Sequence, residues 1–390
     1  MIVSPLSDRG TAIRDALLSH GWEGDLSRLT ASGVAASAFH ITGLSSDTIE
    51  AMVMVATRLG LELITGEDWV ILAGARSRLG AFARPWVQPE AVRALASAVG
   101  MAMPGHPTGA WQHARGALPL AQATVVGVVN ITPDSFSDGG AILGIAEALV
   151  VVDGLLEGGA TVIDVGGEST RPGALPIAPQ EELARVIPVL AALVRRHPAL
   201  LLSVDTVRAS TAAAALDVGA AIVNDVTAGR HDPLLLEVVA ARGAGIVLSH
   251  SRGPLGRLAS YDLVDYAGDV TDGVTRELAA AREQARAAGI AESAMVLDPG
   301  FGFAKTPDQN FRLLAQLDAL VALGSPVLVG PSRKRFLGEA TGRPIDDRER
   351  ATAAVCALAF DRGARLFRLH DPAASRDAIA IAAALHQGES

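Results

Sequence analysis

The sequence predicts an α/β protein in which a small α+β domain precedes a (β/α)8 TIM barrel, and three observations support this. From residue 124 onward, eight β-branched runs alternate with alanine- and leucine-rich stretches over about 270 residues, the number and size that such a barrel needs. Apolar residues make up 49% of the chain and aromatic residues only 4%, so small aliphatic side chains must fill the core, as in parallel α/β folds. The four tryptophans lie in the first third, whereas both lysines lie in the last third.

This compositional break lies near residues 104–109 (PGHPTG), which have the glycine and proline content of a linker. We therefore divide the chain into an N-terminal α+β domain, residues 1–108, and a barrel, residues 109–390. A length of 390 residues agrees with two domains or with one large barrel that carries an extension.

The N-terminal domain shows patterns of both helix and strand. After a weakly predicted opening helix, we expect a strand over 37–42 and a helix over 46–59 that Ser46 or Asp47 caps. Strands over 62–65 and 69–72 and a helix from Pro89 follow. Because no metal, nucleotide or nucleophile signature occurs here, we interpret this domain as a docking or dimerising module.

The second part reads as repeated strand–helix units. The expected strands are 124–130, 161–165, 200–205, 221–225, 245–250, 294–298, 326–330 and 365–370, and long helical stretches include 145–157, 180–196, 271–288 and 348–362. An open doubly wound sheet would have fewer strands and usually a Gly-x-Gly-x-x-Gly motif after the first, which is absent. The pattern favours the closed barrel.

Charge and composition exclude several classes of protein. A formal net charge of −9 without any run of basic residues argues against a nucleic-acid partner. No secretory signal and no apolar stretch of spanning length is present, so we expect no membrane association and a cytoplasmic location. The single cysteine, Cys356, lies in an apolar run, which indicates core packing and a reducing compartment.

Lysine is almost absent from this arginine-rich chain. Lys305 and Lys334 are the only lysines among 33 basic residues, and both follow apolar runs in turns rich in glycine and proline. Because a compact ammonium does work that a planar guanidinium cannot, we interpret both as site residues rather than as surface charges.

Polar or ionisable residues follow nearly every predicted strand, at Asn130, Asp164, Glu168, Asp205, Asn224, Asp225, His250, Asp298, Ser332, Lys334, Arg368 and His370. Any one of them would also serve as a helix cap. In (β/α)8 barrels, however, the carboxyl ends of the strands carry the chemistry. One polar ligand lying across the mouth of the barrel explains all of them together.

The residue types divide into acceptors and donors. Asp205, Asn224 and Asp298 offer acceptors that suit a flat heterocycle with an amino group and a ring N–H. A donor-rich set suits an anion and comprises Arg171, Ser332, Lys334, Arg368 and His370. The loops after the seventh and eighth strands are the usual phosphate site of this fold, and the loops 130–140 and 166–173 have the composition of loops that close over a ligand.

Seven motifs in order then make the chain from Trp111 to its C-terminus resemble dihydropteroate synthase, the folate-pathway enzyme that sulfonamides inhibit. They lie at residues 127–138 (GVVNITPDSFSD), 168–173 (ESTRPG), 203–206 (SVDT), 223–225 (VND), 297–300 (LDPG), 330–334 (GPSRK) and 368–370 (RLH). The first motif and the Ser-Arg-Lys turn are specific, whereas the short ones are weak alone.

The resemblance implies the reaction and the roles of the residues. The family joins 6-hydroxymethyl-7,8-dihydropterin diphosphate to 4-aminobenzoate, giving 7,8-dihydropteroate and pyrophosphate. The implied pterin contacts are Asp205, Asn224, Asp298 and Lys334; Asn130 would bind the Mg²⁺ that neutralises the diphosphate, with Arg368, His370 and Arg171 assisting. The 4-aminobenzoate would lie against Thr170, Pro172 and Ser332, closed over by Phe136 and Asp138. Lys334, Asp138, Asp205 and Asp298 are the expected catalytic residues, and a homodimer is expected.

Departures from the family pattern keep alternatives open. Ser249 and Ser251 flank His250 where the family usually has Met-His-Met, and the N-terminal domain has no counterpart in the short bacterial enzymes. A pterin-binding homologue without synthase activity is one alternative, and a methyltetrahydrofolate-dependent methyltransferase is another. A Schiff-base aldolase that uses Lys305 or Lys334 is a third.

Overall fold

The computed structural model describes residues 1–6, 16–20, 36–75, 78–79, 82–83, 88–102, 109–131, 140–168, 176–266 and 268–387. The chain divides into two compact units, Met1–His106 and Pro107–Ser390. The boundary predicted between residues 108 and 109 borders a stretch, 103–108, that lies outside the described residues. None of the helices in the described ranges has the length and apolar character that a membrane crossing needs.

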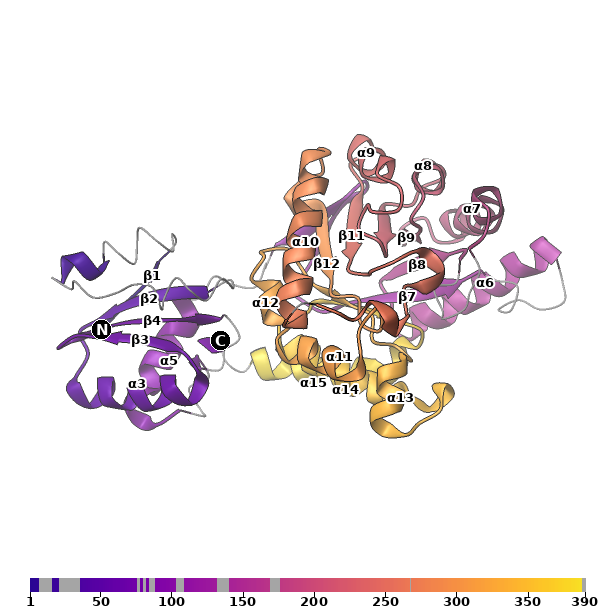
Figure 1. Cartoon of the computed structure of the whole chain (residues 1–390). Helices are drawn as coiled ribbons and strands as arrows, with labels where there is room; N and C mark the ends of the chain where they lie inside the picture. The colour runs from indigo at the N-terminus through magenta and orange to yellow at the C-terminus, as the bar shows by residue number, and fades with distance from the viewer. Residues whose placement is uncertain are drawn as a thin grey trace. The chain divides into compact units, whose positions relative to one another are not determined.

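The N-terminal unit is an antiparallel sheet with helices packed on one face (Figure 1). The strands lie in the order β1 (Ile2–Leu6), β2 (Ala36–Thr42), β4 (Trp69–Ala75) and β3 (Glu62–Thr65), and the helices are α3 (Ser46–Leu59) and α5 (Glu90–Ala102). The apolar face of each helix packs on alternate strand residues such as Phe39, Ile41 and Leu72, which forms a core within this unit.

Two details of this unit differ from the sequence prediction. The chain was expected to open with a helix, but Ile2–Leu6 form strand β1. Pro5 is tolerated there because β1 lies at the edge of the sheet, where a missing N–H breaks no second ladder. The cap of α3 is Ser45, whose hydroxyl accepts a hydrogen bond from the Thr48 N–H at 3.3 Å, rather than Ser46 or Asp47.

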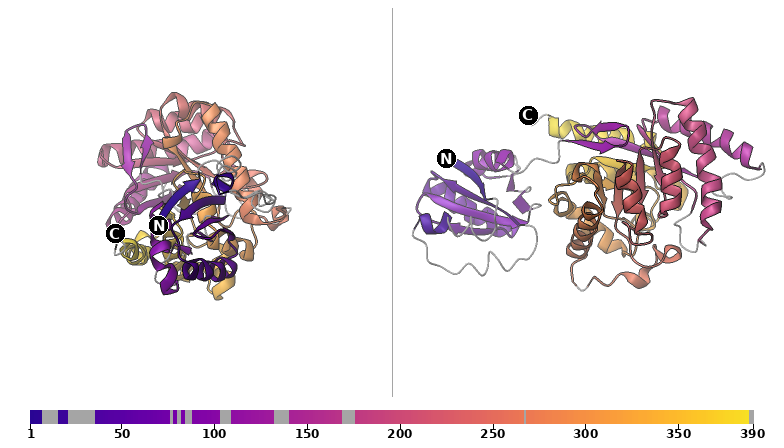
Figure 2. Two further views of the ribbon diagram at one scale, coloured as in Figure 1. Left: turned by 90° about the vertical axis from the view of Figure 1, so that its left-hand side faces the viewer. Right: turned by 90° about the horizontal axis from the view of Figure 1, so that it is seen from above.

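The second unit confirms the predicted (β/α)8 barrel (Figure 2). Its parallel strands are β7 (Thr124–Asn130), β8 (Val162–Gly166), β9 (Leu201–Asp205), β10 (Ile222–Asp225), β11 (Gly245–Ser249), β12 (Met295–Asp298), β13 (Leu328–Val329) and β14 (Leu366–Leu369). The strands pair in chain order, and β14 pairs with β7. A parallel bridge between Leu297 on β12 and Val327, the residue before β13, closes the barrel.

Helices surround these strands and bury aliphatic side chains against them. They are α6 (Gly140–Glu157), α7 (Pro179–Arg196), α8 (Ala209–Asp217), α9 (Leu234–Ala241), α10 (Val270–Ala287), α11 (Pro307–Ala315), α12 (Asp318–Val321), α13 (Arg335–Thr341), α14 (Glu349–Asp361) and α15 (Pro372–Gln387). Cys356 lies in this core on α14, as expected, and burial raises the pKa of its thiol.

A short hairpin closes the amino end of the barrel. It consists of β5 (Ala110–His113) and β6 (Gly116–Pro119), and the Trp111 indole N–H donates to the Ala294 carbonyl at 2.9 Å just before β12. Arg115 bonds the Leu200 carbonyl at 2.8 Å before β9, and Ala114 N–H bonds Ala221 O at 3.4 Å before β10. The buried Trp111 therefore forms the floor of the barrel.

We expect a fragment of residues 109–390 to fold by itself, because both the barrel and its floor lie within it and the N-terminal unit has a separate core. Its thermal midpoint should lie within about 4 °C of that of the barrel transition in the full chain. Circular dichroism during heating would measure this. An insoluble fragment, or one without a cooperative transition, would contradict it.

Candidate active site

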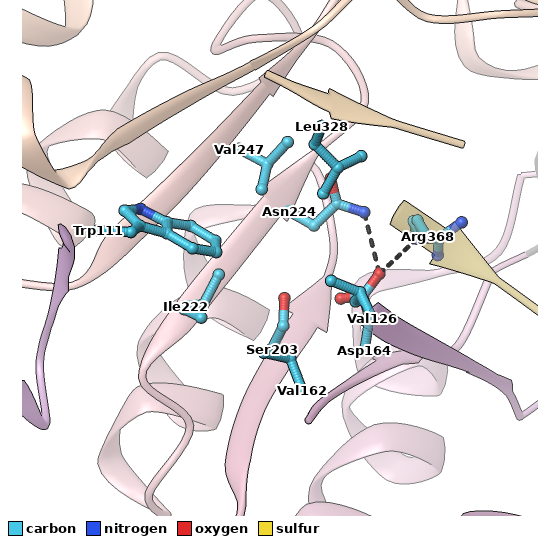
Figure 3. Close-up of a pocket in the computed structure, with 10 residues that line it drawn as sticks. All are labelled: Trp111, Val126, Val162, Asp164, Ser203, Ile222, Asn224, Val247, Leu328 and Arg368. Carbon is cyan, nitrogen blue, oxygen red and sulfur yellow. Dashed lines mark hydrogen bonds and ion pairs between the residues drawn. The ribbon is translucent and has the colours of Figure 1, made fainter. Parts of the chain in front are cut away.

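An arginine between the buried carboxylate of Asp164 and the half-buried carboxylate of Asp205 forms the centre of the barrel mouth. Arg368, on β14, donates through Nε to Asp164 Oδ2 at 2.7 Å and through Nη2 to Asp205 Oδ2 at 2.6 Å. Asn224, on β10, donates through Nδ2 to the same Asp164 oxygen at 3.0 Å (Figure 3). Four strands, β8, β9, β10 and β14, are thus joined through side chains that point into the barrel.

This arrangement changes the acid–base properties of the carboxyl groups. Burial raises the pKa of Asp205 to about 7; Arg368 opposes the shift, and the neighbouring Asp164 carboxylate adds to it. The two carboxylates in turn hold the pKa of Arg368 above its usual value despite its burial. The guanidinium therefore stays charged, while Asp205 is able to exchange a proton near neutral pH.

Asp298 is held rigidly at the end of β12. Its Oδ1 accepts from the Gly300 N–H at 2.8 Å, and its Oδ2 accepts from the Ser249 hydroxyl at 3.1 Å. Burial raises its pKa, and these hydrogen bonds and the Lys334 charge oppose that shift. The two carboxyl oxygens are thus held from two sides, Oδ1 by the loop that follows β12 and Oδ2 by the side chain of Ser249.

Lys334 caps α13 and faces this cluster. Its ammonium lies 3.9 Å from the centre of the Phe303 ring, a cation–π contact. Burial lowers the pKa of Lys334 to about 8, and the charge of Asp298 opposes this, with smaller contributions from Arg368 and Asp205. Lys334, Asp298, Asp205 and Arg368 thus lie close enough to influence one another electrostatically.

The turn before Lys334 is strained and anchored. Arg333 has a left-handed φ of 58°, and its N–H bonds Thr352 Oγ1 at 3.3 Å. Arg348 donates to the Arg333 carbonyl at 3.0 Å, which fixes the turn from behind. On its other side, Ser332 Oγ lies 3.2 Å from the His370 N–H and 3.1 Å from His370 Nδ1, so these two predicted site residues meet.

A small cavity of about 10 Å³ lies between these polar groups and the Trp111 floor, close to the minimum volume that one water needs. Asp164 and Asn224 line it together with Ser203 and aliphatic side chains (Figure 3). Within the described ranges, Asp164 Oδ1 and Asn224 Oδ1 are buried acceptors without a hydrogen-bond partner. Burying an acceptor without a hydrogen bond costs free energy, so a hydrogen-bond donor bound in this cavity would be stabilising.

Comparison with known proteins agrees with this site. A profile of the family described as "Pterin binding enzyme" matches residues 126–370. Dihydropteroate synthase of Mycobacterium leprae is 45% identical over 278 residues, which cover 70% of this chain and 96% of that protein. This chain belongs to the dihydropteroate synthase family.

Solved structures of the family superpose on the same part of the chain. Xanthomonas albilineans dihydropteroate synthase with 4-aminobenzoic acid is 43% identical, with a TM-score of 0.66 over 71% of this chain and 99% of that one. The same enzyme in complex with 7,8-dihydropteroate is 41% identical, with a TM-score of 0.62 over 69% of this chain and 96% of that one. The profile match begins after residues 1–125, which include the N-terminal unit.

The serines that depart from the dihydropteroate synthase pattern have defined partners. Ser249 donates to Asp298, as described above. The Ser251 hydroxyl donates to the Val226 carbonyl at 2.6 Å and accepts from Arg230 at 2.8 Å. Ser249 therefore supports an expected pterin contact by a hydrogen bond, where the family usually has a methionine.

Asn130, which the resemblance predicts to bind Mg²⁺, has the Asp205 carboxylate as a neighbour across Gly166. A Cβ at Gly166 would lie 3.7 Å from Asn130 Oδ1 and 3.5 Å from Asp205 Oδ2, so both oxygens border this glycine. Oxygen is the ligand that Mg²⁺ prefers, and one or two protein ligands suffice when substrate phosphates supply others. The described residues contain no cluster of three or more His, Cys, Asp or Glu that would hold a metal by themselves.

Several predicted residues lie outside the described residues: Phe136, Asp138, Thr170, Arg171 and Pro172. Their roles stay predictions. Among the described residues, the structure brings together Asp205, Asn224, Asp298, Lys334 and Arg368, and it pairs Ser332 with His370. Asn130, at the end of β7, lies beside Asp205 across Gly166.

One central residue was counted among the strand-end residues but was given no specific role from the sequence. Asp164 was noted at a strand end, but its role depends on Arg368 and Asn224, which are 204 and 60 residues away. The available signal was its position inside an otherwise apolar strand, VIDVG, where a carboxylate requires a partner.

The structure argues against a Schiff base at Lys305. Its side chain has no exposed surface, and its Nζ already contacts three partners at 3.0 Å. A nucleophilic amine must reach a carbonyl substrate. Lys305 therefore acts on the structure around it and not on a ligand.

We expect Arg368→Met to lower the free energy of unfolding by about 3–5 kcal/mol at pH 7.5, because the two carboxylates lose their counter-charge. A raised carboxyl pKa favours the protonated form in the folded state. The deficit should therefore be largest above neutral pH and shrink as the pH falls toward 5. Urea unfolding at pH 5 and 7.5 measures this, with the exposed Arg376→Met as control; an equal deficit at both pH values would contradict it.

Proposed function

We propose that this protein is a dihydropteroate synthase that joins 6-hydroxymethyl-7,8-dihydropterin diphosphate to 4-aminobenzoate. The products are 7,8-dihydropteroate and pyrophosphate, which makes the protein a transferase of folate biosynthesis. The substrates of its relatives support small molecules as its partners.

One observation carries the proposal for the site. The carboxyl and amide groups of Asp205, Asn224 and Asp298 lie in one barrel mouth together with the Lys334 ammonium. A pterin has a flat ring with an amino group and ring N–H donors on one edge and acceptors on another. It would satisfy the acceptors and receive a hydrogen bond from the lysine.

The acidic residues differ in what they contribute to pterin binding. Asp298 presents a carboxyl group that Gly300 and Ser249 fix in place, which suits two parallel N–H donors. Asn224 is orientated by the bond from its Nδ2 to Asp164, which leaves its carbonyl oxygen as an acceptor. Asp205 is balanced by Arg368 and brings no unpaired charge against the ring.

Catalysis needs stabilisation of a separating charge. Loss of pyrophosphate leaves cation character on the methylene carbon that is conjugated to the pterin, and negative charge on the leaving group. Donors that gain strength as this charge develops lower the barrier, and we assign that part to Lys334, Ser332 and His370. When bound next to Asn130, Mg²⁺ would neutralise the diphosphate.

Lys334 acts here as a hydrogen-bond donor and not as a nucleophile. Its contact with the face of Phe303 stabilises the ammonium, while burial lowers its pKa to about 8. Its charged form therefore predominates at neutral pH. The finer expectations of a homodimer in the cytoplasm remain predictions, which sedimentation and fractionation would test.

The purified protein should release pyrophosphate when the pterin diphosphate and 4-aminobenzoate are both present. Lys334→Met should lower kcat/KM by about 10²-fold, because it removes a donor aimed at developing charge. Arg350→Met, which alters an exposed side chain on α14, is the matched control and should keep wild-type activity. Pyrophosphate release that is absent in the wild type, with pterin binding retained, would favour the inactive homologue instead.

Removing divalent metal with a chelator should abolish pyrophosphate release, and added Mg²⁺ should restore it. Asn130→Ala should raise the Mg²⁺ concentration for half-maximal activity by about tenfold, since one oxygen ligand of few is lost. A coupled pyrophosphate assay across Mg²⁺ concentrations measures this. The same Mg²⁺ dependence in both proteins would remove Asn130 from the metal site.

A further inference from the structure

Lys305 is a buried lysine whose amino nitrogen bonds only within the protein; burial lowers its pKa to about 7, and the charge of Asp298 opposes this shift. Its Nζ lies 3.0 Å from the Gly300 carbonyl, 3.0 Å from the Phe303 carbonyl and 3.0 Å from His250 Nδ1. An ammonium has three donors, so this set of acceptors is complete. With 0% of its surface exposed, the side chain is also shielded from solvent and ligand.

His250 is orientated to accept from this lysine. Its Nε2 lies 3.0 Å from Glu277 Oε2, and Glu277 is held in turn by Arg252. Because a carboxylate only accepts, Nε2 carries the hydrogen and Nδ1 is left as an acceptor. Burial lowers the pKa of His250 to about 4, and the Lys305 charge adds to this, so the imidazole is neutral.

The lysine encloses a strained turn. Gly300, Gly302 and Ala304 have φ values of 67°, 78° and 48°, so three of five consecutive residues are left-handed. A Cβ at Gly300 would lie 1.8 Å from the His250 carbonyl oxygen, which leaves no space for another residue there. A backbone of this shape persists only when its surroundings fix it. The two carbonyl bonds to Lys305 contribute to this, together with Asn310 Oδ1, which accepts from the Gly302 N–H at 2.8 Å, and the Tyr266 hydroxyl, which donates to the Ala304 carbonyl at 3.0 Å.

The same turn sets two of the predicted pterin contacts. Its Gly300 N–H donates to Asp298 Oδ1 at 2.8 Å. Its Phe303 ring covers the Lys334 ammonium, and a Cβ at Gly302 would lie 2.9 Å from Lys334 Cδ. A shift of the turn would therefore move both the carboxylate and the ammonium.

We propose that Lys305 is a positioning residue for the pterin site, whose ammonium fixes the turn 300–304 and, through it, places Asp298 and Lys334. The proposal rests on the proposed synthase function only for the identity of the ligand. It also accounts for the lysine in an arginine-rich chain. Three acceptors converge on one enclosed point, whereas the donors of a guanidinium spread over a plane that would not fit there.

The test uses the full chain with Lys305→Met and Lys305→Arg. Leu193→Ala, a truncation in the buried core of α7, serves as a control for lost stability that does not touch the turn. Both Lys305 variants should raise the KM for the pterin diphosphate by about tenfold, which corresponds to one lost interaction of ordinary strength. Leu193→Ala should leave that KM unchanged while lowering the thermal midpoint.

Hydrogen exchange of the peptide that spans residues 299–306 provides a readout without any ligand. Both Lys305 variants should exchange at least about tenfold faster there than wild type and Leu193→Ala. Exchange and pterin KM equal to those of Leu193→Ala would overturn the inference. Wild-type exchange and KM in Lys305→Arg would also overturn it, because charge alone would then suffice.

These outcomes separate the inference from the proposed function. If the wild type neither binds the pterin diphosphate nor releases pyrophosphate, the synthase proposal fails. The exchange of the 299–306 peptide then still decides whether Lys305 fixes the turn.

Discussion

The pairing of Arg368 with Asp164 and Asp205 is the constraint on which the mouth of the barrel depends. Three strands contribute one charged side chain each to a low-dielectric interior, and none of the three would be stable there without the others. Because Asp164 also accepts a hydrogen bond from Asn224 Nδ2, the ion pair fixes the orientation of the Asn224 amide. One electrostatic cluster thus holds β8, β9, β10 and β14 in register and presents acceptors to a ligand.

The two lysines have different surroundings and different roles. Lys334 stands at the mouth with an aromatic face against its ammonium, while Lys305 lies behind it and bonds only to the protein. Lys305 is buried and Lys334 is half-buried, so both charges require compensation, and they share Phe303: its ring contacts Lys334 and its carbonyl accepts from Lys305. The loop between β12 and α11 is therefore the part of the barrel where buried positive charge and strained backbone depend on one another.

Much of the fold follows from local pattern. The barrel strands were predicted to within about two residues, because β-branched runs and the glycines that end them are short-range signals. Strand β13 is shorter than expected, since Val327 joins the sheet only through a bridge, and β1 was missed because Pro5 conceals an edge strand. At the site, strand ends identified Asp205, Asn224, Asp298 and Lys334. The importance of Asp164 could not be predicted from the sequence, because its partner Arg368 is 204 residues away. The task of Lys305 could not be predicted either, because it depends on the folded shape of the turn 300–304 and on His250, which is 55 residues away.

The hairpin that carries Trp111 gives the barrel a sealed base. Among the described residues the base offers no opening, so a ligand would reach the barrel from the carboxyl ends of the strands. A ligand bound deeper in the barrel could not leave while a second ligand is bound between it and the opening. The deeper ligand must therefore bind first. Two ligands that share this opening would therefore bind in a fixed order and leave in the reverse order, although each binding step is reversible.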